Sequence, residues 1–386
     1  MKRVSLLLAA VSSLAALTLE LAACSTTSSP SAPNPAMDAG GGADAAPRSF
    51  DFTALHQELF GGAWKSEGVV VLYQGSIVYE EYASGFDAKK RHILYSASKS
   101  IGGALVGIAI ADGAMKLTDS VCTFVPPPIG ADPKLCDTTI ESLLQMTSGM
   151  KWSEDYGSDP TTSNVLQMLY GNETDMGAYA AVQPRAADVA TKWSYSSGDA
   201  NLLARALRGA LKSEDPRAWA KRKLFDPAGL TSAIFESDRS GTLVFSSSCF
   251  MTARDMAKFG QLYLDDGMSG ATRVLPAGWA AYSIKPAAPV AVAAPRIADA
   301  GAGNSGGSYG ASFWLNAASS TASPDTWLYP QAPVDAFSAE GHYGQKIFIV
   351  PSRHLVVVRV GNDRDPVFDP GPMVGRAVEA IDRGAQ

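Results

Sequence analysis

Apolar and polar positions along the chain predict β-strands near both ends of its globular part. Residues 68–82 read GVVVLYQGSIVYEEY, two runs of strand-forming residues around Gln74-Gly75-Ser76, which is typical of a β-hairpin. Residues 346–350 and 354–360 are almost wholly apolar, as buried strands are, and Pro351-Ser352-Arg353 reads as the turn between them. We therefore expect both ends of the globular part to contribute strands to a sheet.

Between these strands, apolar residues recur at helical spacing. Residues 98–115 show this most clearly, and Asp112-Gly113 marks the end of the helix, because glycine suits the left-handed position that follows a helix. Thr252 is placed to cap another helix, with Asp255 at the third position of a capping box. The other helices expected are residues 139–147, 162–170, 198–211, 218–224 and 373–383, and the helix that Thr252 caps reaches residue 264.

This order of elements predicts the domain organisation. Strands at both ends with helices between them favour an α/β sheet domain that is closed by its own termini, with a helical lobe inserted at roughly residues 117–240. Residues 286–308 are rich in Ala, Pro, Gly and Ser, which predicts a surface loop. The sequence contains no internal repeat.

The first 49 residues have the pattern of an export signal followed by a tether. A positively charged start precedes an apolar run, and Leu21-Ala22-Ala23-Cys24 resembles a bacterial lipobox, in which Cys24 is acylated. Residues 1–23 are thus interpreted as a lipoprotein signal peptide, although Glu20 is atypical; the alternative is an ordinary secretory signal with an incidental cysteine. Residues 24–49 are expected to form a disordered Ser/Pro/Gly/Ala tether. The protein would then be exported and held at the membrane, facing the periplasm or the cell surface, through a lipid anchor only.

Composition excludes several classes of function. The chain has 386 residues, a net charge of −6 and 18% charged residues, without the basic clusters that a nucleic-acid surface requires. Four cysteines are too few for a disulfide scaffold, and four histidines without a metal-binding spacing argue against a zinc enzyme. We therefore expect residues 50–386 to form a domain that uses no metal, no cofactor and no nucleic acid.

The motif with the clearest chemistry is Ser96-Ala97-Ser98-Lys99, an S-x-x-K sequence at the start of the helix at 98–115. Residues at i and i+3 of a helix lie on one face, about 5–6 Å apart, so the Lys99 amine can reach the Ser96 hydroxyl. A neutral Lys99 could then accept the serine proton. Ser148-Gly149-Met150-Lys151 is a second literal match, but it follows a helix and precedes a turn glycine, which favours Ser96 as the nucleophile.

Two further segments contain candidate site residues. In Trp193-Ser194-Tyr195-Ser196-Ser197-Gly198, Tyr195 could move protons and Ser197 could bind substrate; the alternative is a turn tyrosine followed by a capping serine. In Gly341-His342-Tyr343-Gly344-Gln345, Gly344 would allow close approach of a substrate and the Gln345 N–H could donate to an oxyanion. Taken alone, this second segment also reads as a glycine-rich loop that enters a strand.

Together these elements resemble the serine β-lactamase/penicillin-binding-protein superfamily, and most of all its esterase-like and 6-aminohexanoate-dimer-hydrolase-like branch, which is similar in build to class C β-lactamases. Five segments carry the resemblance in the same order and spacing: residues 95–114, 143–157, 193–205, 249–268 and 333–353. The resemblance implies a β-lactamase-like α+β fold, in which an antiparallel sheet is flanked by helices and carries an inserted all-helical lobe.

The resemblance also implies roles for single residues. Ser96 looks like the acyl-accepting nucleophile, Lys99 like its activating partner, and Tyr195 like the tyrosine that transfers protons to the leaving group and activates water. The N–H groups of Ser96 and Gln345 fall where the family forms its oxyanion hole. Three more positions bear on substrate binding. Ser197 stands where many members have Asn, and His342 where β-lactamases and peptidases have Lys. Tyr156 matches a tyrosine in a loop over the site; the alternative is that it is a surface aromatic residue.

A competing motif is Gly303-Asn304-Ser305-Gly306-Gly307, which matches the G-x-S-x-G nucleophile elbow of α/β-hydrolases. Asp335 and His342 follow it in the chain order of a catalytic triad. An elbow requires a strand before the serine and a helix after it, whereas Ser305 lies in a Gly/Ser-rich loop, so we do not favour it.

The sequence therefore predicts an exported serine hydrolase that cleaves a small ester or linear amide through an acyl-enzyme on Ser96. The first alternative is a true β-lactamase or D-Ala-D-Ala carboxypeptidase, and the second is a catalytically silent ligand-binding or sensor domain. Because export leads to an oxidising compartment, we expect Cys122 and Cys136 to form a disulfide and Cys249 to remain a buried thiol.

Overall fold

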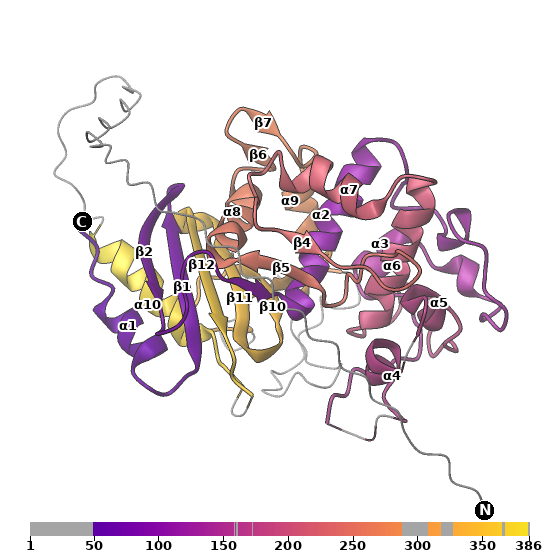
Figure 1. The fold of residues 1–386 in the computed structure, drawn as a ribbon, viewed down its shortest axis with the longest axis horizontal. Coiled ribbons are helices and arrows are strands. Elements are labelled where there is room, and N and C mark those ends of the chain that lie inside the picture. Colours follow the sequence, from indigo (N-terminus) through magenta and orange to yellow (C-terminus); the bar gives the residue numbers. More distant parts are fainter. Residues whose placement is uncertain are drawn as a thin grey trace, which may run out of the picture. The chain divides into compact units, whose positions relative to one another are not determined.

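A central antiparallel sheet organises the chain in the computed structural model, which describes residues 49–157, 159, 161–171, 173–287, 308–317, 327–364 and 367–384 (Figure 1). Seven strands follow the order β2-β1-β12-β11-β10-β9-β8, and every neighbouring pair is antiparallel. The predicted signal peptide, Cys24, nearly all of the predicted tether, and Ser305 lie outside the described residues. The strands are β1 (Ser66–Tyr73), β2 (Ser76–Tyr82), β8 (Ser308–Tyr309), β9 (Trp314–Leu315), β10 (Phe337–Gly341), β11 (Gln345–Val350) and β12 (Leu355–Gly361).

The predicted hairpins form, and they place the two ends of the domain side by side. Gln74 and Gly75 both have positive φ, at 50° and 78°, which is the conformation of a tight two-residue hairpin turn between β1 and β2. β12, near the end of the chain, pairs with β1 on one side and with β11 on the other. The sheet is thus closed by its own termini, as the sequence predicts.

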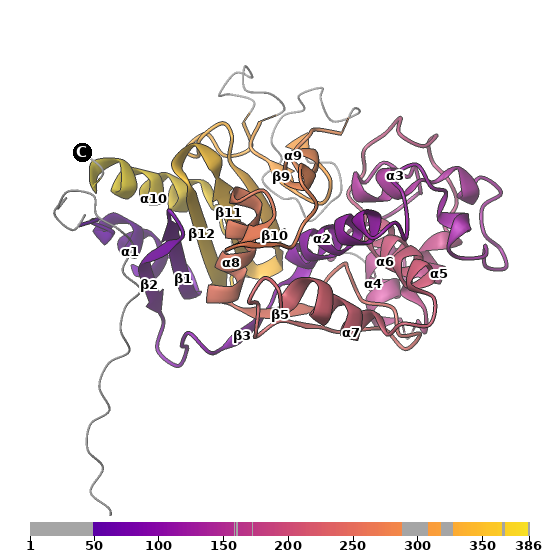
Figure 2. The same cartoon turned by 90° about the horizontal axis from the view of Figure 1, so that it is seen from above.

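Helices cover both faces of the sheet (Figure 2). Alternate residues of β1 point to opposite faces, so Val69 and Val71 enter one core and Val70 and Leu72 enter the other. The first core is closed by α1 (Thr53–Phe60) and α10 (Gly371–Gly384), and the second by α8 (Ala253–Leu264) and α2 (Ser98–Ala111). Thr252 caps α8 by accepting a hydrogen bond from the Asp255 N–H at 3.2 Å. This arrangement confirms the predicted antiparallel sheet flanked by helices.

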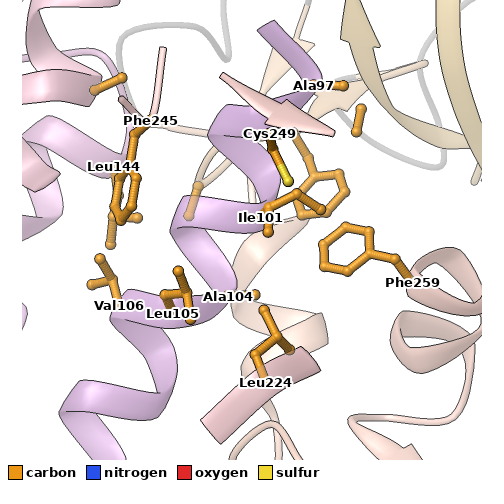
Figure 3. Packing of buried hydrophobic residues seen from close by; sticks show 14 of the residues in the cluster. Ala97, Ile101, Ala104, Leu105, Val106, Leu144, Leu224, Phe245, Cys249 and Phe259 are labelled. Carbon is orange, nitrogen blue, oxygen red and sulfur yellow. The ribbon is translucent and has the colours of Figure 1, made fainter. Parts of the chain in front are cut away.

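The helix that follows Ser96 lies at the centre of the molecule. Every residue of α2 from Ser98 to Ala109 is buried, and its apolar side chains pack against Leu144, Leu224, Phe245, Cys249 and Phe259 (Figure 3). Its glycines are a steric requirement, because a Cβ at Gly102 would lie 2.5 Å from the ring of Phe245. The start of α2 is therefore fixed in position by the core.

The inserted lobe is mostly helical, in agreement with the prediction. It contains α3 (Ile140–Leu144), α4 (Asn164–Tyr170), α5 (Met176–Ala181), α6 (Ser197–Leu211) and α7 (Pro216–Ala220), which continues as a π-helical turn at Lys221–Phe225. The predicted all-helical range of 117–240 is too long, because β4 (Ile234–Phe235) pairs with β5 (Cys249–Thr252), and β5 pairs with β3 (Arg91–Ile93). β6 (Met268–Ser269), β7 (Thr272–Arg273) and α9 (Trp279–Ser283) complete the strands and α-helices of the described residues.

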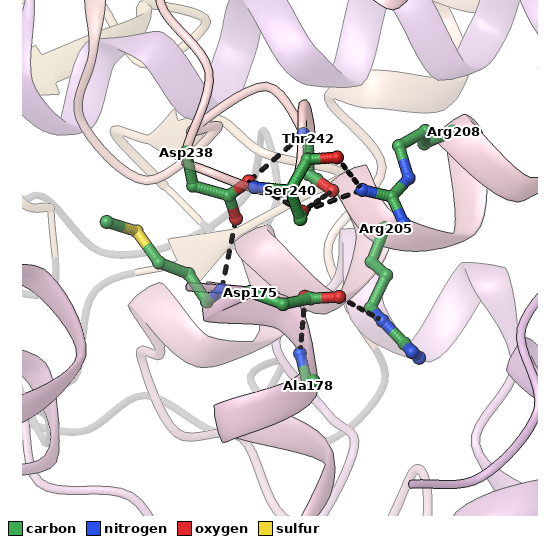
Figure 4. A network of polar contacts seen from close by, with 8 residues as sticks. Asp175, Ala178, Arg205, Arg208, Asp238, Ser240 and Thr242 are labelled. Carbon is green, nitrogen blue, oxygen red and sulfur yellow. Dashed lines mark hydrogen bonds and ion pairs between the residues drawn. The ribbon is translucent and has the colours of Figure 1, made fainter. Parts of the chain in front are cut away.

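Covalent and polar links hold the lobe together. Cys122 and Cys136 form a disulfide, and Cys249 is a buried free thiol, as expected. Asp175 caps α5 through the Ala178 N–H at 2.8 Å and accepts a hydrogen bond from Arg205 of α6 at 3.0 Å (Figure 4). Asp238, Ser240 and Arg208 join the segment after β4 to the same two helices. No helix within the described ranges is both long enough and apolar enough to cross a membrane.

Candidate active site

Ser96 and Lys99 are close together, as the S-x-x-K spacing predicts. Ser96 lies in a 3₁₀ turn (Tyr95–Ala97) that leads into α2, and Lys99 lies in the first turn of that helix. The Lys99 Nζ is 3.1 Å from the Ser96 Oγ. Lys99 is only 2% exposed, whereas Ser96 lines a pocket of about 400 Å³. The hydroxyl thus faces the pocket and the amine lies behind it.

The surroundings of Lys99 favour its neutral form. Burial lowers the pKa of Lys99 to about 8, while the negative charge of Glu154 acts in the opposite direction. The Nζ also donates to the Ser197 hydroxyl at 3.2 Å and to the Ser246 carbonyl at 3.1 Å. A substantial fraction of Lys99 is therefore neutral at slightly alkaline pH and can accept a proton from Ser96.

Tyr195 lies directly before α6, with its side chain against the same pocket. Its ring stacks on Trp314 of β9, with a centroid separation of 5.3 Å, and the Lys99 Nζ lies 4.7 Å from its ring centroid. Burial and the nearby charges of Glu154 and Glu340 raise the pKa of the Tyr195 phenol, against the effect of its hydrogen bond with Ser96. Tyr195 is consequently a protonated phenol at neutral pH.

Glu154 is a buried carboxylate that our sequence analysis did not identify. It accepts hydrogen bonds from the backbone N–H of Ser197 at 2.9 Å, from the Ser197 hydroxyl, and from the Trp152 Nε1 at 2.6 Å. Ser197 therefore lies between Glu154 and Lys99. The nearby Tyr156 indicated that this loop lies over the site, but nothing in the sequence distinguishes Glu154 itself from a surface glutamate.

Tyr156 and His342 meet at the opening of the pocket. Their ring centroids are 5.2 Å apart, and the Tyr156 hydroxyl donates to the Glu154 Oε1 at 3.2 Å. The partial burial of His342 and the positive charge of Lys346 lower the pKa of the imidazole, which is thus neutral at pH 7. Burial raises the pKa of the Tyr156 phenol.

Gln345, predicted as an oxyanion donor, is placed differently from the other candidates. It is buried at the start of β11, its side-chain amide donates to the Gly361 carbonyl, and it does not line the pocket. Gly341 and His342 do line it. A Cβ at Gly341 would lie 1.9 Å from the Leu94 carbonyl oxygen, so the end of β10 runs tightly against the turn that carries Ser96. This close approach brings the start of the turn at 341–345 beside Ser96, and the backbone N–H of Gln345 as an oxyanion donor stays a prediction.

Gly344 lies in the turn between β10 and β11 for a conformational reason. Its φ is +87°, and a Cβ there would lie 2.0 Å from the Arg359 Nη1. Gly344 lines the pocket, and the turn and the buried arginine beneath it both require a glycine here; close approach of a substrate stays a prediction.

The geometry does not support the second S-x-x-K sequence, whereas Ser305 of the elbow motif lies outside the described residues. The Ser148 hydroxyl donates to the Asp199 Oδ1 at 2.8 Å, while Lys151 is exposed, so this second S-x-x-K sequence forms no serine–lysine pair. Burial raises the pKa of Asp199 to about 7. Asp335, the acid of the alternative triad, accepts hydrogen bonds from the backbone and hydroxyl of Ser352. Within the described residues, no group of His, Cys, Asp and Glu is arranged to hold a metal ion.

The chain combines an antiparallel sheet, an inserted helical lobe and a serine–lysine pair between the sheet and the lobe. This combination defines a hydrolase of the β-lactamase superfamily. The model of the beta-lactamase family matches residues 56–380, and the chain belongs to this family.

Individual relatives agree with this assignment. The 6-aminohexanoate-dimer hydrolase of Paenarthrobacter ureafaciens is 25% identical over 225 residues, which is 55% of this chain and 56% of the relative, so the match spans about half the length of that protein. A penicillin-binding protein homologue from Caulobacter crescentus has a TM-score of 0.65 at 15% identity, over 89% of this chain and 99% of its own. A family VIII carboxylesterase has a TM-score of 0.63 at 17% identity, over 86% and 95%. These two structures show a shared fold.

Proposed function

We propose that the protein is an exported serine hydrolase that cleaves small esters or linear amides through an acyl-enzyme on Ser96. The single observation that carries this proposal is the 3.1 Å contact between the Ser96 Oγ in the pocket and the buried Lys99 Nζ. The silent sensor domain is disfavoured, because burying an amine whose pKa is lowered has no evident use in a domain that only binds ligands.

In the proposed acylation step, the Ser96 Oγ attacks the substrate carbonyl carbon while neutral Lys99 accepts the hydroxyl proton. The carbonyl oxygen becomes an oxyanion, which the N–H of Ser96 and an N–H of the turn at 341–345 stabilise. Within that turn the proposed donor is the N–H of Gln345, the first residue of β11. Removing one donor of an oxyanion hole typically reduces turnover by about 10²–10³-fold.

Tyr195 completes the proposed cycle. Because its pKa is raised, the phenol carries a proton that it can donate to the leaving oxygen or nitrogen, and the Lys99 ammonium beside it can replace that proton. A water molecule then attacks the acyl carbon and gives a proton to the neutral Lys99 amine, directly or through the Tyr195 hydroxyl. The bond between the Ser96 oxygen and the acyl carbon breaks, the Lys99 ammonium returns this proton to the Ser96 oxygen, and the acid leaves.

Two observations support an ester or linear amide substrate. His342 is neutral, and Lys346 is paired with Glu340, so neither offers the unpaired cation that would suit the carboxylate of a β-lactam or of a D-Ala-D-Ala peptide. The names of a matched relative and of a structural neighbour, a 6-aminohexanoate-dimer hydrolase and a family VIII carboxylesterase, are in line with this choice.

The test is covalent labelling together with turnover. A fluorophosphonate probe should label the wild-type protein, which should hydrolyse p-nitrophenyl butyrate. The Ser96→Ala variant should lose both properties, and the control Ser305→Ala, from the competing motif, should retain both. If Ser305→Ala were the inactive variant, the proposed mechanism would be wrong.

The cellular location is proposed separately, from the lipobox-like sequence that ends at Cys24. Wild-type protein produced in a bacterium fed a palmitate analogue should become labelled and fractionate with membranes, and Cys24→Ser should do neither. Labelling that persists in Cys24→Ser would exclude this anchor.

A further inference from the structure

The pocket does not end at the catalytic residues. Beyond Ser96 and Tyr195 it continues past the turn at 342–344 and over the ends of β10 and β11. We call this extension the Glu340 arm and define it by Leu328, Tyr329, Glu340, Lys346, Val367 and Phe368.

The floor of the Glu340 arm is an ion pair that is almost completely buried. The Glu340 carboxylate accepts hydrogen bonds from the Tyr329 hydroxyl at 2.7 and 2.9 Å, from the Ser338 hydroxyl at 2.7 Å, and from the Lys346 Nζ. Its oxygens are therefore satisfied. Lys346 has three N–H donors, and Glu340 is its one hydrogen-bond acceptor among the described residues. Lys346 consequently has donors left for a ligand.

The other charges that face the Glu340 arm cancel one another. Asp363 is paired with the buried Arg359 at 2.6 Å. Arg364 lies over the Tyr343 ring, 5.3 Å from its centroid, and Asp369, which has the opposite charge, also lines the pocket. Glu340 with Lys346 and Asp363 with Arg359 are ion pairs, and the charges of Asp369 and Arg364 are equal and opposite. These groups at and beside the arm therefore sum to no net charge for a charged ligand to neutralise.

The walls of the arm are apolar and aromatic. Trp314, Leu328, Phe368 and Pro370 line this part of the pocket, and Val367, which also lines it, is 62% exposed. An apolar wall above a neutral pair with free N–H donors suits an uncharged group that ends in a hydrogen-bond acceptor.

We propose that the Glu340 arm is a second substrate subsite, which binds an uncharged apolar or aromatic group bearing a carbonyl or ether oxygen, attached to either half of the scissile ester or amide. This inference rests on the proposed hydrolase function, and it specifies the substrate class: elongated, uncharged esters or amides rather than the shortest ones.

The test compares substrates of different length. In an acyl series, p-nitrophenyl acetate, 4-phenylbutyrate and 4-(4-methoxyphenyl)butyrate share one leaving group; in an alcohol series, ethyl and 4-phenylbutyl acetate share one acyl group. In one of the two series the elongated substrate should have a kcat/KM about 10-fold or more above the short one, since one buried methylene alone can contribute that much. Val367→Trp should fill the arm and abolish this preference.

A second variant addresses the polar part of the proposal. Lys346→Met keeps the length of the side chain but removes its donors, so the methoxy compound should lose its advantage over the unsubstituted phenyl compound. The matched control is Ile77→Trp in β2, outside the pocket, at a residue that is 45% exposed. In this variant the ratio of kcat/KM for the long substrate to kcat/KM for the short one should equal that of the wild type.

The possible failures can be told apart. If folded wild-type protein hydrolyses no ester and takes no fluorophosphonate label, the proposed hydrolase function fails. If it hydrolyses p-nitrophenyl acetate through Ser96 but shows no preference for length in either series, or keeps that preference in Val367→Trp, the subsite proposal alone is overturned.

Discussion

Arg359 donates a hydrogen bond to the carbonyl oxygen of Gly344 at 3.1 Å, from a guanidinium that is fully buried beneath the active-site turn. The same guanidinium binds Asp363 at 2.6 Å and the Ser66 hydroxyl at 3.0 Å, and the Asp363 N–H donates to the Tyr343 carbonyl at 3.2 Å. Two consecutive carbonyls of the turn that borders Ser96 are thus held by one buried ion pair.

Replacing Arg359 by Met should therefore destabilise the protein severely. The change leaves Asp363 buried without its cation, which typically costs about 3–5 kcal/mol. The free energy of unfolding from urea denaturation measures this loss. Arg376→Met removes an exposed ion pair with Glu379 and should change that free energy by less than about 1 kcal/mol. Equal effects of the two substitutions would contradict a structural role for the buried pair.

Tyr195→Phe should reduce turnover of p-nitrophenyl butyrate by about 10²-fold or more, the usual range for a general acid–base group. The stacking on Trp314 remains, because only a hydroxyl is removed, so thermal unfolding should hardly change. Tyr73→Phe, outside the pocket, is the matched control and should keep wild-type kinetics. Wild-type kinetics in Tyr195→Phe would make Tyr195 a packing residue.

The pH dependence of activity should report the ionisation of Lys99. Since the neutral amine accepts the Ser96 proton in the proposed mechanism, kcat/KM should rise with pH and level off above about 8, the pKa that burial gives this lysine. Glu154→Gln removes a negative charge that stabilises the ammonium, so the midpoint should move to lower pH.

The control for this profile is Glu379→Gln, on the exposed side of α10, whose profile should coincide with that of the wild type. A midpoint that stays fixed in Glu154→Gln, or that moves to higher pH, would show that Lys99 is not the titrating base.

The identity of residue 342 should influence the choice between esters and β-lactams. Neutral His342 cannot form a charge-assisted hydrogen bond to a substrate carboxylate, and such a bond contributes about 1.5–3 kcal/mol, or 10- to 100-fold in specificity. His342→Lys should thus raise kcat/KM for nitrocefin relative to p-nitrophenyl butyrate by about that factor. Efficient nitrocefin hydrolysis by the wild type, without improvement in the lysine variant, would refute this explanation.

The sequence predicted the parts of the site that depend on local spacing. Ser96 and Lys99 are one helical turn apart, so their contact follows from helix geometry alone. Glu154 could not be predicted in this way, because its partner Ser197 is 43 residues further along the chain. Lys346 was hidden for a different reason: it is the second residue of a strand that is apolar after its first two positions, and its partner Glu340 becomes a neighbour only through the hairpin register.

The difference between local spacing and long-range contacts also explains which strands were not predicted. The long apolar strands β11 and β12 were predicted correctly, whereas β10 was not, because FSAEG contains small and polar residues and is identified as a strand only by its neighbours. The strand that runs beside Ser96 is thus defined by tertiary pairing.

The position of β12 has a consequence for the order in which the molecule can assemble. β12 lies between β1 and β11, although it is the last strand in the sequence and β1 is the first. Until residues near 361 have been synthesised, the hairpin of β1 and β2 has no partner strand, and its apolar face remains exposed to water. The sheet is therefore completed after synthesis of nearly the whole chain, and a ribosome that stops early releases a chain whose first strands have nothing to pair with.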